Sequence, residues 1–189
     1  MRGMHLALGK VSKPAPRKRW SGLRRLFRAQ EGTTAVEFGL LALPFIALIA
    51  ATLETCLMLV AQEVLQNATS RAARLIMTGQ AQDAGMTSTQ FQQAVCAQAN
   101  SLLSCGGIYV NVQTFTSFTN VADLDPLQNG TLNPALVHYS TGGPGNIVLV
   151  QTFYEWPLML GLLGFDLSNS NGGARLLVGT AVFRNEPYQ

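Results

Sequence analysis

The chain has 189 residues, of which 48% are apolar and 12% are charged, and this composition excludes a disordered, collagen-like or coiled-coil protein. Its net charge of +3 is unevenly divided, because residues 1–32 contain nine Lys or Arg and one acid, whereas residues 33–189 contain four Lys or Arg and nine acids. The basic residues stop where a long apolar run begins, which indicates a membrane insertion signal. The remaining chain is acidic and its aromatic residues are not interleaved with Lys or Arg, so we expect no nucleic-acid partner.

The apolar run covers residues 38–61 and contains one charged side chain, Glu54. As a helix it would be about 36 Å long, enough to cross a hydrocarbon core of about 30 Å. The alternative is a buried core helix, but the chain that follows is too short to surround one on all sides. Six Lys or Arg lie between residues 17 and 28, so the positive-inside rule predicts a cytoplasmic N-terminus and an external C-terminal domain.

The junction between the basic leader and the apolar run reads, from Glu31 to Phe38, EGTTAVEF. A glycine, four uncharged residues, a glutamate and an aromatic residue resemble the class III signal of type IV pilins and pseudopilins. In that family a prepilin peptidase cuts after the glycine on the cytoplasmic side and leaves the helix attached. The resemblance implies cleavage between Gly32 and Thr33. A conventional cleaved secretory signal fits poorly, because its apolar region and its basic leader would both be shorter.

Glu37 and Glu54 are the two acids of the expected membrane helix. An ionised carboxylate at the edge of the hydrocarbon is costly unless it is paired, so we expect a partner for Glu37. The Thr33 amine created by cleavage would supply a cation in the same subunit or in a neighbour, and the pilin resemblance implies the neighbour. The alternative role of Glu37 is that of an acid near a helix N-terminus. Glu54 either reaches water at the outer interface or makes a second contact between subunits.

Helical spacing continues beyond the apolar run, with Gln62, Glu63, Asn67 and Arg71 on the polar faces, and predicts one helix from Thr33 to Thr78 with Gly79 as its C-cap. Thr87 and Gln90 form a candidate capping box for a second helix over 88–103. Strands are expected over 108–119, 146–156 and 175–184, the last with Leu176, Val178, Thr180 and Val182 on one face.

Residues 120–145 and 166–174 are rich in loop-forming residues, and the first stretch is long enough to carry a binding surface. Together the elements predict an α+β fold in which a long N-terminal transmembrane helix, a second helix and a small antiparallel sheet pack together. We expect a cytoplasmic leader over 1–32, a transmembrane helix over 33–62 and a periplasmic domain over 63–189.

Cys96 and Cys105 stand at the end of the second expected helix and before the first strand, whereas Cys56 lies in the membrane run. In an oxidising compartment the first two would form a disulfide. The alternatives are two free thiols or half a metal site. A metal is disfavoured, because no C-x2-C pair or nearby His completes four ligands.

Sequence motifs for catalysis, cofactors or small-molecule substrates are absent. His138 is the one histidine outside the leader and lies in a polar loop. Gly142, Gly143 and Gly145 form a turn without the Lys-Ser/Thr ending of a phosphate loop. Asp123 and Asp125 lack the supporting acids of a calcium or glycosidase site. We therefore expect no enzyme, the alternative being a membrane-tethered enzyme that uses His138.

Three stretches resemble the TadE-like family of tight-adherence (Flp-type) pilus systems: the EGTTAVEF junction with its Pro44-containing helix, the FYEWP of 153–157, and the closing AVFRNEPY of 181–188. The chain is too long for the major pilin of these systems and too short for their relative with a von Willebrand type A domain. The resemblance implies a minor pilin or pseudopilin of the inner membrane that a prepilin peptidase processes. Its expected partners are membrane lipid, other pilins and the inner-membrane assembly machinery, and its expected role is pilus assembly and surface attachment.

The closing motif consists of Phe183, Arg184, Asn185, Glu186, Pro187 and Tyr188. From the residues themselves, we expect Phe183 and Tyr188 to flank the sheet, Arg184 and Glu186 to form an ion pair, and Pro187 to end the strand. The alternative function is an uncleaved, signal-anchored periplasmic protein that binds a glycan or an envelope protein through residues 120–145.

Overall fold

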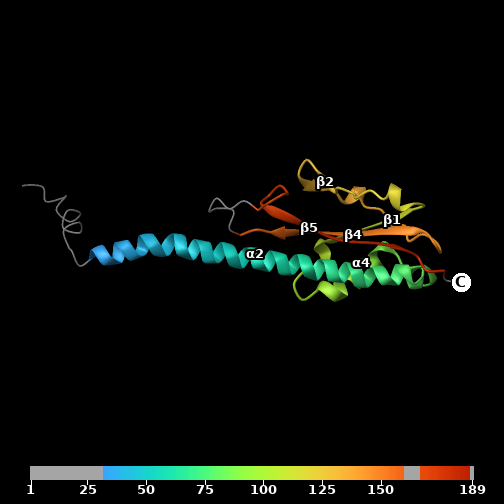
Figure 1. The fold of residues 1–189 in the computed structure, drawn as a ribbon, viewed down its shortest axis with the longest axis horizontal. Coiled ribbons are helices and arrows are strands. Elements are labelled where there is room, and N and C mark those ends of the chain that lie inside the picture. The colour runs from blue at the N-terminus through green and yellow to red at the C-terminus, as the bar shows by residue number, and fades with distance from the viewer. Residues whose placement is uncertain (1–31, 160–166, 188–189) are drawn as a thin grey trace, which may run out of the picture. The chain divides into compact units, whose positions relative to one another are not determined.

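The computed structural model describes residues 32–159 and 167–187 (Figure 1). The chain divides into two units, Met1–Phe45 and Ile46–Gln189, and helix α2, Thr33–Met77, contributes residues to both. Within the described residues, the first unit consists of Gly32 and the opening turns of α2. The second unit holds the rest of α2 and every described strand. The fold is α+β, as the sequence predicts.

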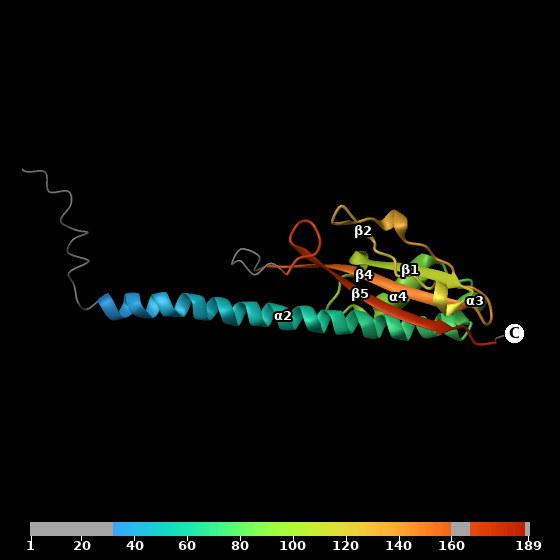
Figure 2. The ribbon, with the colours of Figure 1, turned by 45° about the horizontal axis from the view of Figure 1, so that its top comes forward.

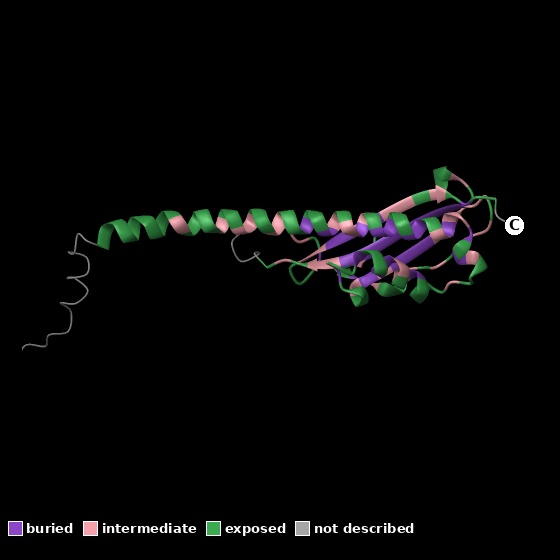
Figure 3. Ribbon diagram, turned by 90° about the horizontal axis from the view of Figure 1, so that it is seen from below, coloured by how far each residue is buried: buried purple, intermediate pink, exposed green. Residues whose placement is uncertain are grey.

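The burial of the apolar side chains changes along helix α2. Its large apolar side chains before Met58 are exposed, among them Leu40 at 71% and Leu43 at 69%. From Met58 onward one stripe is buried at helical spacing, through Ala61, Leu65, Ala68, Ala72 and Ile76. Figure 3 shows this change from exposed to buried residues along the helix. The helix is long and apolar enough to cross a membrane, and none of its most apolar stretch is buried, which is consistent with a single-pass membrane protein.

The end of α2 matches the sequence prediction within one residue. Gly79 has a φ of 82° and donates its N–H to the carbonyl of Ile76 at 3.1 Å, so it closes the helix in the left-handed conformation that favours glycine. Helix α3, Gln80–Asp83, is a single further turn that the sequence analysis did not predict.

Helix α4, Ser88–Ala99, begins with the predicted capping box. The N–H of Thr87 donates to Gln90 Oε1 at 2.8 Å, and the N–H of Gln90 donates to Thr87 Oγ1 at 3.3 Å. The helix ends four residues before the predicted boundary of 103. The reason is that the Leu102 and Leu103 N–H groups both bond to the carbonyl of Ala99, which turns the chain so that Leu103 is buried.

Strands β1 (Ile108–Phe115), β4 (Ile147–Pro157) and β5 (Ala174–Arg184) form one antiparallel sheet in the order β1-β4-β5. The register places Val112 opposite Val150 and Gln151 opposite Thr180. β1 ends before the predicted boundary of 119, because Phe118–Asn120 form a 3₁₀ turn. α2 and α4 lie on one face of this sheet (Figures 1 and 2), where Val110, Val112, Val148, Val150 and Leu177 join the helices in one core cluster.

The opposite face of the sheet is covered by the segment between β1 and β4. The sequence predicts a loop over residues 120–145, but strands β2 (Leu127–Gln128) and β3 (Thr131–Leu132) form a hairpin within it. Its turn is Asn129-Gly130, with φ values of 53° and 74°, as two-residue hairpin turns require. Leu132 packs with Phe153 and Leu176 in a second core cluster, so this segment is part of the folded domain.

Candidate functional site

The predicted processing junction lies at the first residue of α2. The helix begins at Thr33, directly after Gly32, and the described residues 32–41 are all exposed, with Phe38 at 73%. A Cβ added at Gly32 would meet no heavy atom within 4 Å, and Gly32 has no positive φ. Neither space nor backbone conformation in the described structure therefore requires glycine at position 32.

Glu37 is the fifth residue of α2, and the first turn contains no acid. The favourable effect of a helix N-terminus on a carboxylate decays beyond the first turn, which weakens the capping role considered for Glu37. Thr33 and Glu37 are separated by four residues and so lie on the same side of the helix. The helix thus presents Glu37 beside its own first residue.

Glu54 is half-buried and contacts the end of β4. Its carboxylate accepts a hydrogen bond from the Met159 N–H. Beside this contact is an apolar groove of about 300 Å³, lined by Ala50, Leu53, Leu57, Trp156, Pro157 and Met159. Glu54 is therefore engaged within its own chain.

Two glutamines of α2 bind the edge of the sheet. Gln62 Nε2 donates to the carbonyl of Val178 at 2.8 Å. Gln66 Nε2 donates to the carbonyl of Thr180 at 2.9 Å, and Gln66 Oε1 accepts the Thr180 N–H at 3.0 Å. The sequence pattern predicts a polar face for Gln62 and makes no prediction for Gln66. The i, i+4 spacing of two amides after the apolar run is the signal that could have identified them.

α2 also approaches the sheet closely at Gly179. The Thr69 and Thr152 hydroxyls lie 2.5 Å apart and are both buried. A Cβ at Gly179 would collide with Thr69 Oγ1 and would lie 2.7 Å from Thr152 Oγ1. Glycine at this position allows the helix to sit on β5.

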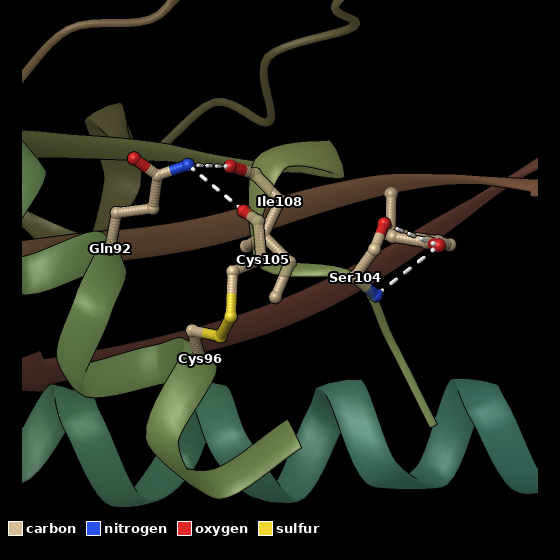
Figure 4. The surroundings of a disulfide bond; sticks show 6 residues. Gln92, Cys96, Ser104, Cys105 and Ile108 are labelled. Atoms are coloured by element: carbon tan, nitrogen blue, oxygen red, sulfur yellow. Dashed lines mark hydrogen bonds between the residues drawn. A yellow bond between two sulfur atoms is a disulfide. The ribbon is translucent and has the colours of Figure 1, made fainter. Parts of the chain in front are cut away.

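Cys96 and Cys105 form a disulfide with a Cα–Cα distance of 5.3 Å, as predicted (Figure 4). Gln92 Nε2 spans the same turn and donates to the carbonyl of Ile108 at 2.5 Å and to that of Cys105 at 3.3 Å. α4 is therefore joined covalently and by hydrogen bonds to the start of β1. Cys56 is a free, exposed thiol.

The closing motif connects three segments of the domain. Asn185 is 3% exposed and its Nδ2 donates to the carbonyls of Thr141 and Gly143 at 3.0 and 3.1 Å. The Glu186 N–H donates to the carbonyl of Met77 at 2.9 Å. Phe183 packs against the core beside the sheet, as expected, whereas Tyr188 lies outside the described residues.

The ion pair expected between Arg184 and Glu186 is not formed. Instead, Arg184 Nε donates to the carbonyl of Gly145 at 2.8 Å. β5 ends at Arg184, three residues before Pro187, so the strand stops without needing the proline. The reason is that Asn185 bonds to the turn before β4. The Asn185 N–H donates to the carbonyl of Asn146, and the Asn185 carbonyl accepts from the Gly145 N–H.

His138 and the loop glycines, which the sequence raised as candidates for catalysis or phosphate binding, have structural roles in the described part of the chain. The backbone N–H of His138 donates to Asn111 Oδ1 at 2.9 Å, and His138 is exposed. Gly142 and Gly145 have φ values of 64° and 77° and form the predicted turn. Burial raises the pKa of Tyr139 above its usual value of 10.0. Among the described residues, no group of three His, Cys, Asp or Glu is placed to hold a metal ion.

Residues 32–74 match the family model described as TadE-like protein. This is the family that the sequence resembles, and the matched segment begins at Gly32 and covers most of α2. No curated protein and no solved structure matches the chain. The match suggests a Tad pilus-associated protein, and it covers most of α2, the candidate transmembrane helix.

Proposed function

We propose that the protein is a TadE-like minor pilin or pseudopilin, processed by a prepilin peptidase and needed to assemble a tight-adherence pilus, and hence for surface attachment. The observation that carries this proposal is the junction itself. An exposed glycine is followed at once by an exposed apolar helix with Glu37 at its fifth position, and the family match begins at the same glycine.

The proposed cut falls between Gly32 and Thr33. The exposure of the whole 32–41 stretch leaves the peptide bond accessible, and the structure offers no packing or conformational reason for glycine at this position. Recognition by a peptidase supplies such a reason. Cleavage would remove the basic leader 1–32 and leave Thr33 as the first residue of the mature chain.

In the proposed topology, residues 33–62 span the inner membrane and residues 63–189 form the periplasmic domain. The excess of Lys and Arg before α2 supports a cytoplasmic N-terminus. The Cys96–Cys105 disulfide supports an oxidising compartment for the domain. The acidic character of residues 33–189 agrees with a chain whose positive charge is discarded with its leader.

Glu37 is proposed as the assembly contact. In the membrane its carboxylate requires a cation, and the free amine of Thr33 in a neighbouring subunit would provide one. Glu54 is retained as a second candidate, but its hydrogen bond to Met159 already engages it within the chain. Glu37 therefore determines the register between subunits in this account.

The proposal assigns the protein an interaction role with other pilins and the inner-membrane assembly machinery. This role follows the TadE-like family match, because TadE-like pilus proteins are structural proteins. The periplasmic domain then acts as the part that neighbouring subunits contact outside the membrane.

The experiment replaces Glu37 with Ala in the full chain and compares it with Glu63→Ala, which changes an exposed acid further along the same helix. Glu37→Ala is expected to leave membrane insertion intact and to reduce the number of pili per cell and surface attachment. Glu63→Ala is expected to leave both unchanged. Normal piliation with Glu37→Ala would remove this carboxylate from the mechanism, and normal piliation after deletion of the whole protein would contradict the proposed function.

A further inference from the structure

The end of β4 lies beside a part of α2 that belongs to the apolar run. The Met159 N–H donates to the Glu54 carboxylate, and Trp156, Pro157 and Met159 share an apolar groove with Ala50, Leu53 and Leu57. Both walls of the groove belong to the second unit of the chain. The contact therefore fixes the level along the helix at which this strand ends.

That level lies within the expected membrane span. Glu54 is seven residues before Ala61, the last residue of the apolar run, which corresponds to about 10 Å along a helix. Leu53 and Leu57 at this level are 59% and 50% exposed, so they retain apolar surface for lipid. The end of β4 thus occupies the same layer as the outer part of the membrane helix.

The backbone at the end of β4 is suited to a layer with little water, where every N–H requires a partner. Pro157 has no N–H, the Leu158 N–H donates to the carbonyl of Gly173 at 3.1 Å, and the Met159 N–H donates to Glu54. None of these three residues leaves a backbone donor without a partner. Glu54 has a specific use here, because its carboxylate accepts the N–H of Met159, two residues after β4 ends at Pro157.

The side chains near the end of β4 are also suited to contact with lipid. Met159 is 79% exposed, the highest value among the exposed large apolar residues described. Trp156 is half-buried against α2, and tryptophan is enriched where proteins meet the membrane–water boundary.

We propose that the end of β4 is a lipid-contacting surface in the periplasmic leaflet, and that the groove beside Glu54 takes a phospholipid acyl chain. The inference rests on the membrane anchor of the proposed function. Trp156 lies at the headgroup boundary, and Met159 lies deeper, among the acyl chains. The periplasmic domain is then held against the membrane by two contacts, α2 and the end of β4, which fixes its tilt for the next subunit.

The experiment uses the full chain with Trp20→Phe, so that Trp156 is the remaining one of the two tryptophans. The protein is placed in nanodiscs of phosphatidylethanolamine and phosphatidylglycerol, with bromine atoms near the headgroup end of the acyl chains or near their methyl end. Trp156 emission is expected to be quenched most by the shallow bromines and little by iodide in the buffer. Strong iodide quenching without bromolipid quenching would overturn the inference.

Two variants sharpen the result. Met159→Asp is expected to lower the bromolipid quenching and raise the iodide quenching of Trp156, with the Cys96–Cys105 disulfide still formed. Phe118→Asp changes another exposed apolar residue, at 59% exposure after β1, and is expected to change neither. If Trp156 is quenched to the same extent in the Met159→Asp chain as in the chain with Met159, the end of β4 does not enter the lipid.

The remaining outcomes separate this inference from the proposed function. Protection of Trp156 from both quenchers would mean that protein, such as a second copy of this chain, covers the groove, and would overturn the lipid assignment. If carbonate washing releases the protein from vesicles, this would contradict both the membrane anchor and this inference. A chain that resists extraction while Trp156 stays exposed to iodide would contradict this inference alone.

Discussion

The side-chain amide of Gln66 bonds to the backbone of Thr180 in both directions, donating to its carbonyl at 2.9 Å and accepting its N–H at 3.0 Å. Gln66 thereby makes the two hydrogen bonds that a residue of a neighbouring strand would make at the outer edge of β5. An open strand edge is a site of unwanted pairing with another chain. Helix α2 and the sheet are thus joined by hydrogen bonds as well as by apolar packing.

Replacing Gln66 with Ala is expected to lower the free energy of unfolding by about 1–2 kcal/mol, because both backbone groups of Thr180 lose a half-buried partner. The measurement is urea unfolding of the α+β domain in detergent, followed by circular dichroism. Asn67→Ala, at the next and exposed position of the helix, is the matched control. Equal urea midpoints for the two variants would show that the Gln66 bonds do not stabilise the domain.

Replacing Gly179 with Ala tests the close approach of α2 to β5. The new Cβ would collide with the Thr69 hydroxyl and lie 3.1 Å from the Leu65 carbonyl, so a loss of about 1–3 kcal/mol is expected. Thr69→Ala in the same chain should recover part of the loss, because it removes the colliding hydroxyl. Gly106→Ala is the control, since a Cβ there meets no heavy atom within 4 Å. A tolerated Gly179→Ala would contradict the described contact.

The disulfide is expected to stabilise the start of β1. Replacing both Cys96 and Cys105 with Ala should cost about 2–3 kcal/mol, since the bond closes a short loop in the unfolded chain. Peptide mapping without reductant should recover the two cysteines in one linked peptide pair, and urea unfolding of the double variant gives the energy. Free thiols at both positions in protein taken from the membrane would rule the bond out in the cell.

Much of the fold follows from local pattern. The 3.6-residue period through Leu65, Ala68 and Ala72 predicts the helix beyond the membrane run, and the Thr87–Gln90 box predicts the start of α4, because both depend on residues close in sequence. The disulfide was predictable because topology and spacing agree. Strand ends were less accurate, because β1 stops where a 3₁₀ turn competes with the sheet.

The contacts between distant segments could not be predicted in the same way. Which strand lies beside Gln66, and at which level of α2 the strand β4 ends, depend on the packing of segments more than 100 residues apart. The prediction of an Arg184–Glu186 ion pair was wrong for a similar reason. Arg184 Nε bonds instead to the carbonyl of Gly145, which is distant in the sequence. The hairpin at Asn129-Gly130 did carry a local signal, the Asn-Gly pair, that was outweighed by the length of the loop.

The most direct test of the account is the mass of the mature chain. The protein is purified from membranes of cells with and without prepilin peptidase, together with a Gly32→Ala variant, and its N-terminal peptide is identified by mass spectrometry. The account predicts a chain that begins at Thr33 when the peptidase is present, and an intact leader both without the peptidase and in the Gly32→Ala chain. A chain from peptidase-containing cells that still begins before Gly32 would contradict the account.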